Sequence, residues 1–175
     1  MNKLASLLVG ALVAAVAALP TAANGNGSQT VTSRVKNEPF AEIDIVPCLE
    51  PELPAAITGT IKSGVFHLTL EPGAEIVGVD EEGFPIVAGQ FHVTFTQTGT
   101  FTAVTALGTF QGQFTFWGGF NGNGQNHVGT FASALQGTTP SGERFGASSV
   151  EHFNVSADEL PRVNEFFKLV CHGSV

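Results

Sequence analysis

The sequence predicts an all-β protein, an antiparallel up-and-down barrel of about eight strands, with a β-sandwich as the alternative. Three observations support this prediction. Apolar and polar residues alternate with a period of two over much of residues 40–171. Gly, Asn and Pro interrupt the alternation at short, regular intervals. No window of about ten residues after the N-terminal segment has a convincing helical stripe.

The N-terminal segment has the features of an export signal, and we expect residues 1–23 to be a signal peptide. Lys3 supplies a positive charge, an apolar run covers residues 4–19, and Pro20 ends the run before the small residues 21–23. The run is shorter than the roughly 20 residues of a spanning helix; an uncleaved membrane anchor is the alternative. The mature protein is therefore expected to be secreted and extracellular, with no membrane attachment after cleavage.

Residues 24–38 are polar, and we expect them to form a disordered leader. A single β domain is then expected over residues 39–175. Its first strands are predicted at residues 40–46, 55–62 and 65–71.

An acidic segment follows at residues 73–83 and is expected to be a hairpin tip. Residues 85–88 then lead into the clearest alternation of the chain, from Gln90 to Val104, where phenylalanines lie on one face and threonines on the other. The pattern passes through Gly99 without slipping, which predicts one long strand with a bend there. Long strands with a mid-strand glycine favour a barrel.

The second half of the domain repeats this pattern. Residues 109–120 alternate in the same way, with Phe and Gly on one face. Asn and Gly at 121–125 favour a turn because both accept positive φ. Further strands are expected at 127–136, 145–155 and 163–171. Phenylalanine has no polar group to satisfy, so packing alone accounts for a Phe-rich interior.

Cys48 and Cys171 are the two cysteines of the chain and lie near the ends of the predicted domain. Export would place them in an oxidising compartment, so a disulfide is expected. It would close a loop of about 124 residues and stabilise the fold by roughly 5 kcal/mol. Two free thiols or a metal pair are the alternatives, and only His172 adjoins either cysteine.

The composition excludes several partners. Loss of Lys3 with the signal peptide changes the formal net charge from −8 to −9. An acidic, charge-poor chain has no electrostatic footprint for nucleic acid and no Lys/Arg cluster for anionic membranes. No metal, cofactor or catalytic motif is recognisable, so no metal site, no cofactor and no catalytic residue is predicted. The sequence leaves the oligomeric state open.

Four residues are candidates for binding a ligand: Trp117, Asn121, Glu151 and His152. Trp117 and Asn121 flank a glycine-rich stretch and are suited to hold a ring or a sugar, although Trp117 covering a barrel end is the alternative. Glu151 falls on the apolar side of its strand, where an ionisable group is costly unless paired. The hypothesis is that Glu151 points into the barrel toward a polar partner or ligand; the alternative is a solvated position at the rim.

Several motifs resemble a family of small secreted proteins of high-GC Gram-positive bacteria. They are the segments 91–101, 114–121 and 151–155 and the closing Cys171-His172. The resemblance covers roughly residues 48–172 and implies export from a bacterial cell. The family has no assigned activity, so the resemblance implies no catalytic residues. A weaker likeness, at the level of the fold, is to lipocalins and to barrels of the allene oxide cyclase and dirigent type.

Three functions are therefore considered. The first is a non-enzymatic secreted barrel that binds a small apolar or amphipathic ligand on its Phe-lined face. The second is a barrel enzyme of the cyclase or isomerase type, in which Glu151 and His152 would be the first residues to test. The third is a structural or surface-interaction protein with a filled core.

Overall fold

The computed structural model describes residues 27–41, 56–79, 85–123, 126–156 and 166–172, and in these ranges the chain forms strands and turns and no helix. The prediction of an all-β protein is confirmed. The strands, in chain order, are β1 (Gln29–Val35), β2 (Glu38–Ala41), β3 (Ala56–Leu70), β4 (Glu75–Val79), β5 (Pro85–Ala88), β6 (Phe91–Thr105), β7 (Gly108–Gly122), β8 (Asn126–Thr138), β9 (Arg144–Ser156) and β10 (Phe166–His172).

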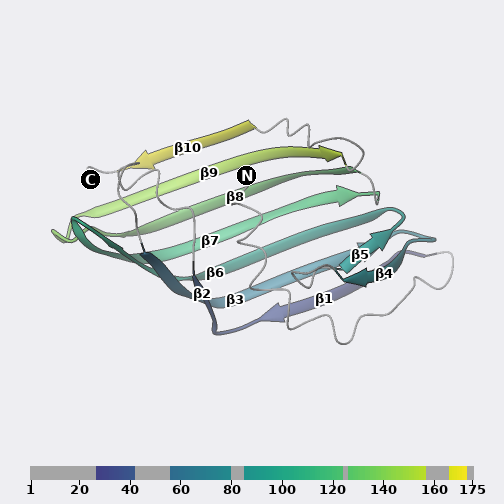
Figure 1. Ribbon diagram of the computed structural model, residues 1–175, viewed down its shortest axis with the longest axis horizontal. Helices are drawn as coiled ribbons and strands as arrows, with labels where there is room; N and C mark the ends of the chain where they lie inside the picture. Colours follow the sequence, from purple (N-terminus) through teal and green to yellow (C-terminus); the bar gives the residue numbers. More distant parts are fainter. Residues whose placement is uncertain (1–26, 42–55, 80–84, 124–125, 157–165, 173–175) are drawn as a thin grey trace.

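One antiparallel sheet contains most of these strands, in the order β1-β3-β6-β7-β8-β9-β10, and β2 pairs with the first half of β3. Figure 1 shows this sheet face-on, with β1 and β10 at opposite edges and β7 in the middle. Strands β4 and β5 form a separate two-stranded sheet. No closed barrel is detected among the described strands, since β1 and β10 are not paired with each other.

The long central strands follow the alternation of the sequence. Strands β6 and β7 pair along their whole length without a register shift, and only Ala106 and Leu107 connect them. The predicted single strand through Gly99 is confirmed as β6. Because the register is unbroken, the buried phenylalanines of β6 lie on the same side of the sheet as the buried phenylalanines of β7.

The N-terminal part of the sheet differs from the sequence prediction in two ways. Residues 29–35 form β1, which pairs with β3, so the prediction of a disordered leader over residues 24–38 is wrong there. The segments 55–62 and 65–71 belong to one strand, β3, and not to two. The register shift between Ile61 and Ser63 is a β-bulge, which bends a strand and does not end it.

Other elements also differ from the prediction in their boundaries. Residues 73–83 do not form a single hairpin tip, because Glu75–Val79 is already strand β4. Residues 42–55, which contain the end of the predicted strand 40–46 and Cys48, lie outside the described residues. Cys171 lies on β10, opposite Ala147 of β9. The disulfide stays a prediction.

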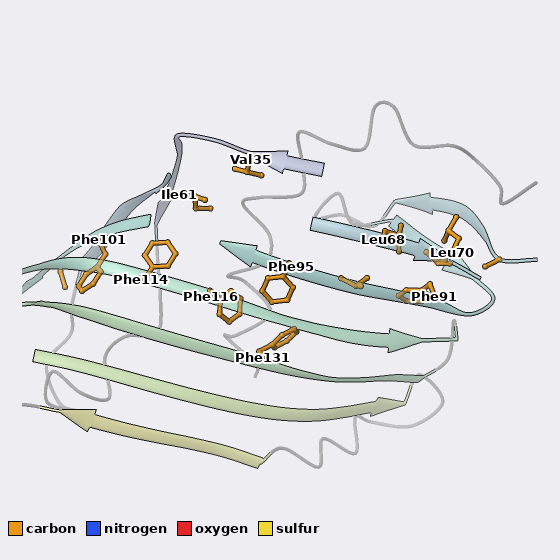
Figure 2. Packing of buried hydrophobic residues seen from close by; sticks show 14 of the residues in the cluster. Val35, Ile61, Leu68, Leu70, Phe91, Phe95, Phe101, Phe114, Phe116 and Phe131 are labelled. Atoms are coloured by element: carbon orange, nitrogen blue, oxygen red, sulfur yellow. The ribbon is translucent and has the colours of Figure 1, made fainter. Parts of the chain in front are cut away.

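Phenylalanine forms most of the hydrophobic core. The rings of Phe95, Phe116 and Phe131 come from β6, β7 and β8, and their centroids lie 5.0 to 5.9 Å apart. Figure 2 shows these three rings on one side of the sheet. We call this side the inner face. Its other aromatic contacts include Phe101 with Phe145, at 6.4 Å between centroids, and these rings belong with buried aliphatic side chains to one core cluster.

The opposite side of the sheet, which we call the outer face, is polar. On β6 it carries His92 and the threonines at even positions from 94 to 102, which are exposed or half-buried. Strands β6 to β9 contain only two residues among Asp, Glu, Lys and Arg, namely Arg144 and Glu151. Because Glu151 lies on the inner face, the outer face of these four strands is almost free of formal charge.

Candidate functional site

Two cross-strand pairs of polar side chains lie on the outer face. His92 of β6 stands opposite Asn121 of β7, with 2.7 Å between Nδ1 and Oδ1. Thr130 of β8 stands opposite His152 of β9, with 2.7 Å between Oγ1 and Nδ1. Since an amide oxygen can only accept, Nδ1 of His92 donates to Asn121, which leaves Nε2 of the neutral ring as an acceptor. The register of the sheet thus places each imidazole ring directly opposite its hydrogen-bond partner.

These two pairs line one hollow of about 510 Å³. The side chains that reach it from the outer face are His92, Asn121, Val128, Thr130, His152 and Asn154. Gly119 lies among them, and a Cβ atom there would lie 2.6 Å from the carbonyl oxygen of Val93. A side chain at position 119 would therefore clash with β6, so glycine is required beside the hollow.

A smaller hollow of about 450 Å³ adjoins the first at the end of the sheet. It shares His92, Asn121 and Val128 with the first hollow and adds Asn123, Asn126 and the carboxylate of Glu71. The side-chain oxygen of Asn123 accepts a hydrogen bond from the backbone N–H of Asn126 at 2.8 Å, which orders this turn. Amide and imidazole groups therefore continue around the strand ends.

Trp117 lies on the same face of β7, two residues before Gly119. It is 41% exposed, which is high for the largest apolar side chain in the chain. Its direct neighbours across the strands are Thr96 and Ala132. Because β7 continues to Gly122, Trp117 lies within the strand and not at its end. The alternative in which Trp117 covers a barrel end is therefore wrong.

Glu151 lies on the other side of the sheet from these residues. It is 5% exposed, and its Oε2 atom is fully buried. Its partner on β8 is Phe131, a core residue. The hypothesis that Glu151 points inward is confirmed, and the solvated rim position is wrong. Consecutive residues of a strand point to opposite faces, so Glu151 and His152 do not share a site.

Two further polar groups lie on the inner face and were missed at the level of the sequence. Gln97 is 4% exposed, between Gly64 of β3 and Phe116 of β7 in the register. The hydroxyls of Ser133 and Ser149 are 2.7 Å apart and half-buried. The signal for Gln97 was present, because position 97 continues the inward positions 91, 93 and 95.

One histidine has a pKa that its surroundings clearly change. The ring of His127 packs against Phe91 and Phe120, with centroids 5.7 and 5.9 Å apart. Partial burial against these rings disfavours the charged imidazolium and lowers the pKa of His127 below its ordinary value. His127 is the second residue of β8 and lies on the side of the inner face, so its titration concerns stability and not the outer hollow.

Among the residues that the structure describes, no group of three or more His, Cys, Asp or Glu side chains is placed to hold a metal ion. The same residues contain no helix long and apolar enough to cross a membrane.

Comparison with known proteins gives no identification. No family model, no curated protein and no solved structure matches the chain. The function must therefore be argued from the geometry of the two faces alone.

Proposed function

We propose that the protein is an exported, non-catalytic binding protein whose outer face binds a neutral saccharide. The observation that carries this proposal is the hollow in which the pairs His92–Asn121 and Thr130–His152 meet, with the exposed Trp117 on the same face of β7. Saccharide sites commonly combine polar groups that grip hydroxyls with an aromatic face that covers the apolar side of the ring.

The near absence of formal charge on the outer face of β6 to β9 favours a neutral ligand. A charged ligand desolvates on binding and needs an opposite charge close by. Of Asp, Glu, Lys and Arg, strands β6 to β9 offer only Arg144 on the outer face, at the start of β9. Neutral hydroxyls are matched instead by the imidazole, amide and hydroxyl groups of the hollow, which both donate and accept.

The polar groups are also ordered before a ligand arrives. Each imidazole in the hollow is held by a side chain directly opposite in the sheet, and the sheet itself is rigid backbone. Groups that are already in place lose little conformational entropy when a ligand binds. This favours a specific site on a face that would otherwise be ordinary solvated surface.

Isothermal titration calorimetry with neutral disaccharides tests the proposal. The probes are cellobiose, maltose, xylobiose and chitobiose. We expect one of them to bind, and His152→Ala or Asn121→Ala to weaken its binding about tenfold, the usual effect of losing one or two hydrogen bonds. Val104→Ala is the matched control, because Val104 is 52% exposed on the same face and outside the hollow. Absence of binding by every probe would contradict the proposal.

A second candidate function concerns the inner face. Gln97 and Glu151 are buried on a face of phenylalanine, a combination suited to a small apolar or amphipathic ligand with a polar head. This candidate requires the sheet to close into the barrel that the sequence predicts, and the mid-strand glycines support such closure. In a β-sandwich, the alternative, a second sheet would cover the face.

Native mass spectrometry of the protein purified from its own host tests this second candidate. A bound small molecule, or an increase in Tm with members of a lipid panel, would support it. Only empty protein, together with an unchanged Tm across the panel, would contradict it. Because Glu151 and His152 lie on opposite faces, no joint catalytic role is proposed for them.

A further inference from the structure

A second large hollow lies on the outer face, farther along β7. Its volume is about 530 Å³. The polar side chains that line it are Lys62, Thr98, Thr100, Gln113, Thr115 and Gln136. Lys62, Gln113 and Gln136 are exposed, and the two amides can both donate to and accept from a ligand. Like the first hollow, this one is lined mainly by neutral hydrogen-bonding groups, and it differs from the first in having one positive charge, that of Lys62.

Trp117 lies between the two hollows. Residues Gln113, Thr115, Trp117, Gly119 and Asn121 follow one another at alternate positions of β7, so their side chains lie on one face. Thr115 borders the second hollow and Gly119 the first. Along β7, the outer face therefore presents the second hollow, the indole of Trp117 and the first hollow in that order.

The distance along β7 from Gln113 in the second hollow to Asn121 in the first is longer than a single sugar ring. Gln113 and Asn121 are eight positions apart on β7, which at about 3.3 Å per residue spans roughly 26 Å. A disaccharide fills one hollow at most. A ligand that contacts both hollows and the indole at once must be a chain of several rings.

We propose that the outer face binds an extended neutral polysaccharide that runs along β7, with one segment in each hollow and a ring stacked on Trp117 between them. This inference rests on the proposed function and specifies its ligand class. Linked segments bind with a gain in effective concentration, because the second segment is already close to its hollow once the first is bound. Affinity should therefore rise with chain length until both hollows are filled.

The test compares chain lengths within one series. Cello-, malto-, xylo- and chito-oligosaccharides of two to six units are titrated calorimetrically into the full-length mature protein. In the series that binds, we expect Kd to fall at least about tenfold from the disaccharide to the hexasaccharide. Gln113→Ala and Gln136→Ala should each weaken hexasaccharide binding severalfold and leave the Kd of the disaccharide unchanged. Trp117→Ala should remove most of the gain with length.

Val104→Ala again serves as the control on the same face, and circular dichroism verifies that each variant is folded. If a disaccharide binds and the Kd does not depend on length, the extended site is overturned while the proposed function stands. The same holds if Gln113→Ala and Gln136→Ala both bind the hexasaccharide as tightly as the wild type. If no saccharide of any length binds, the proposed function fails and the extended site fails with it.

Discussion

The ring of Phe114 on β7 lies directly over Gly99, its partner on β6. A Cβ atom at Gly99 would lie 2.6 Å from Cε1 and Cζ of this ring, far inside van der Waals contact, and it would also clash with the carbonyl oxygen of Thr60. The ring of Phe114 therefore packs in the space that a side chain at position 99 would occupy. Gly99 is a packing requirement of the inner face and not the sign of a turn.

The same relationship recurs across the sheet. A Cβ atom on each of five other inner-face glycines would lie within 2.9 Å of a phenylalanine ring on a neighbouring strand. The pairs are Gly112 with Phe101, Gly118 with Phe131, Gly122 with Phe91, Gly129 with Phe153 and Gly137 with Phe145. Each glycine lowers strand propensity locally, and the ring that covers it restores the buried apolar contact. A phenylalanine ring packed over a glycine of the neighbouring strand is thus a contact that recurs throughout this core.

Gly99→Ala should destabilise the protein by about 1–3 kcal/mol, because the added methyl group overpacks the inner face. Chemical denaturation measures the change in the free energy of unfolding. Gly27→Ala is the control, since a Cβ atom there meets no atom within 4 Å. Equal stability of Gly99→Ala and wild type would show that the ring and the glycine are not packed as described.

Phe131→Ala should be among the most destabilising core substitutions, at about 3–5 kcal/mol. Phe131 contacts four other phenylalanine rings, at centroid distances from 4.7 to 6.4 Å. Leu107→Ala removes a side chain that is 55% exposed and should change stability by less than about 0.5 kcal/mol. Denaturant titration of both variants provides the comparison. A loss at Phe131 no larger than the loss at Leu107 would argue against the aromatic layer.

Glu151→Ala should lower the free energy of unfolding by about 1–3 kcal/mol, because it removes a buried polar group and disturbs the groups around it. Glu143→Ala, in an exposed turn, should have little effect. Glu151→Gln keeps the shape and removes the charge, so its Tm should depend on pH differently from that of the wild type. Identical Tm values for Glu151→Gln and wild type at every pH would contradict the burial of this carboxyl group.

His127 should make the protein less stable in acid. Its pKa is lowered in the folded state, so the unfolded chain binds the proton more readily. The contribution to stability is complete above the unfolded pKa of about 6.5. It is lost as the pH falls from there through the lowered pKa of the folded state. His127→Phe should therefore remove part of the acid dependence of unfolding. Parallel pH profiles for this variant and the wild type would contradict the packing of the imidazole against Phe91 and Phe120.

The period-two alternation made much of the fold predictable. Strands β6 and β7 appear within two residues of their expected ends, and the inward position of Glu151 followed from the same rule. The alternation works because burial on one face forces every second residue to be apolar. In β1 the signal is weak, because only Val31 and Val35 are apolar among its seven residues, and the strand was mistaken for part of a disordered leader.

The outer site was only partly predictable. Trp117, Asn121 and His152 were candidates, but the pairing of Asn121 with His92 depends on the register of two strands, which no local pattern specifies. The bulge in β3 likewise follows from its pairing with β6. The local alternation thus separates Glu151 from the other three candidates, whereas the pairing of distant strands brings His92 to Asn121.

Trp117 is the one tryptophan of the chain, and the chain has no tyrosine, so its intrinsic fluorescence reports on the outer face directly. Titration of the mature protein with the neutral hexasaccharides, with acrylamide quenching at saturation, is the most direct test of saccharide binding there. The account predicts that one series shifts the emission to shorter wavelength and protects Trp117 from the quencher. Unchanged emission and unchanged quenching with every saccharide would contradict it.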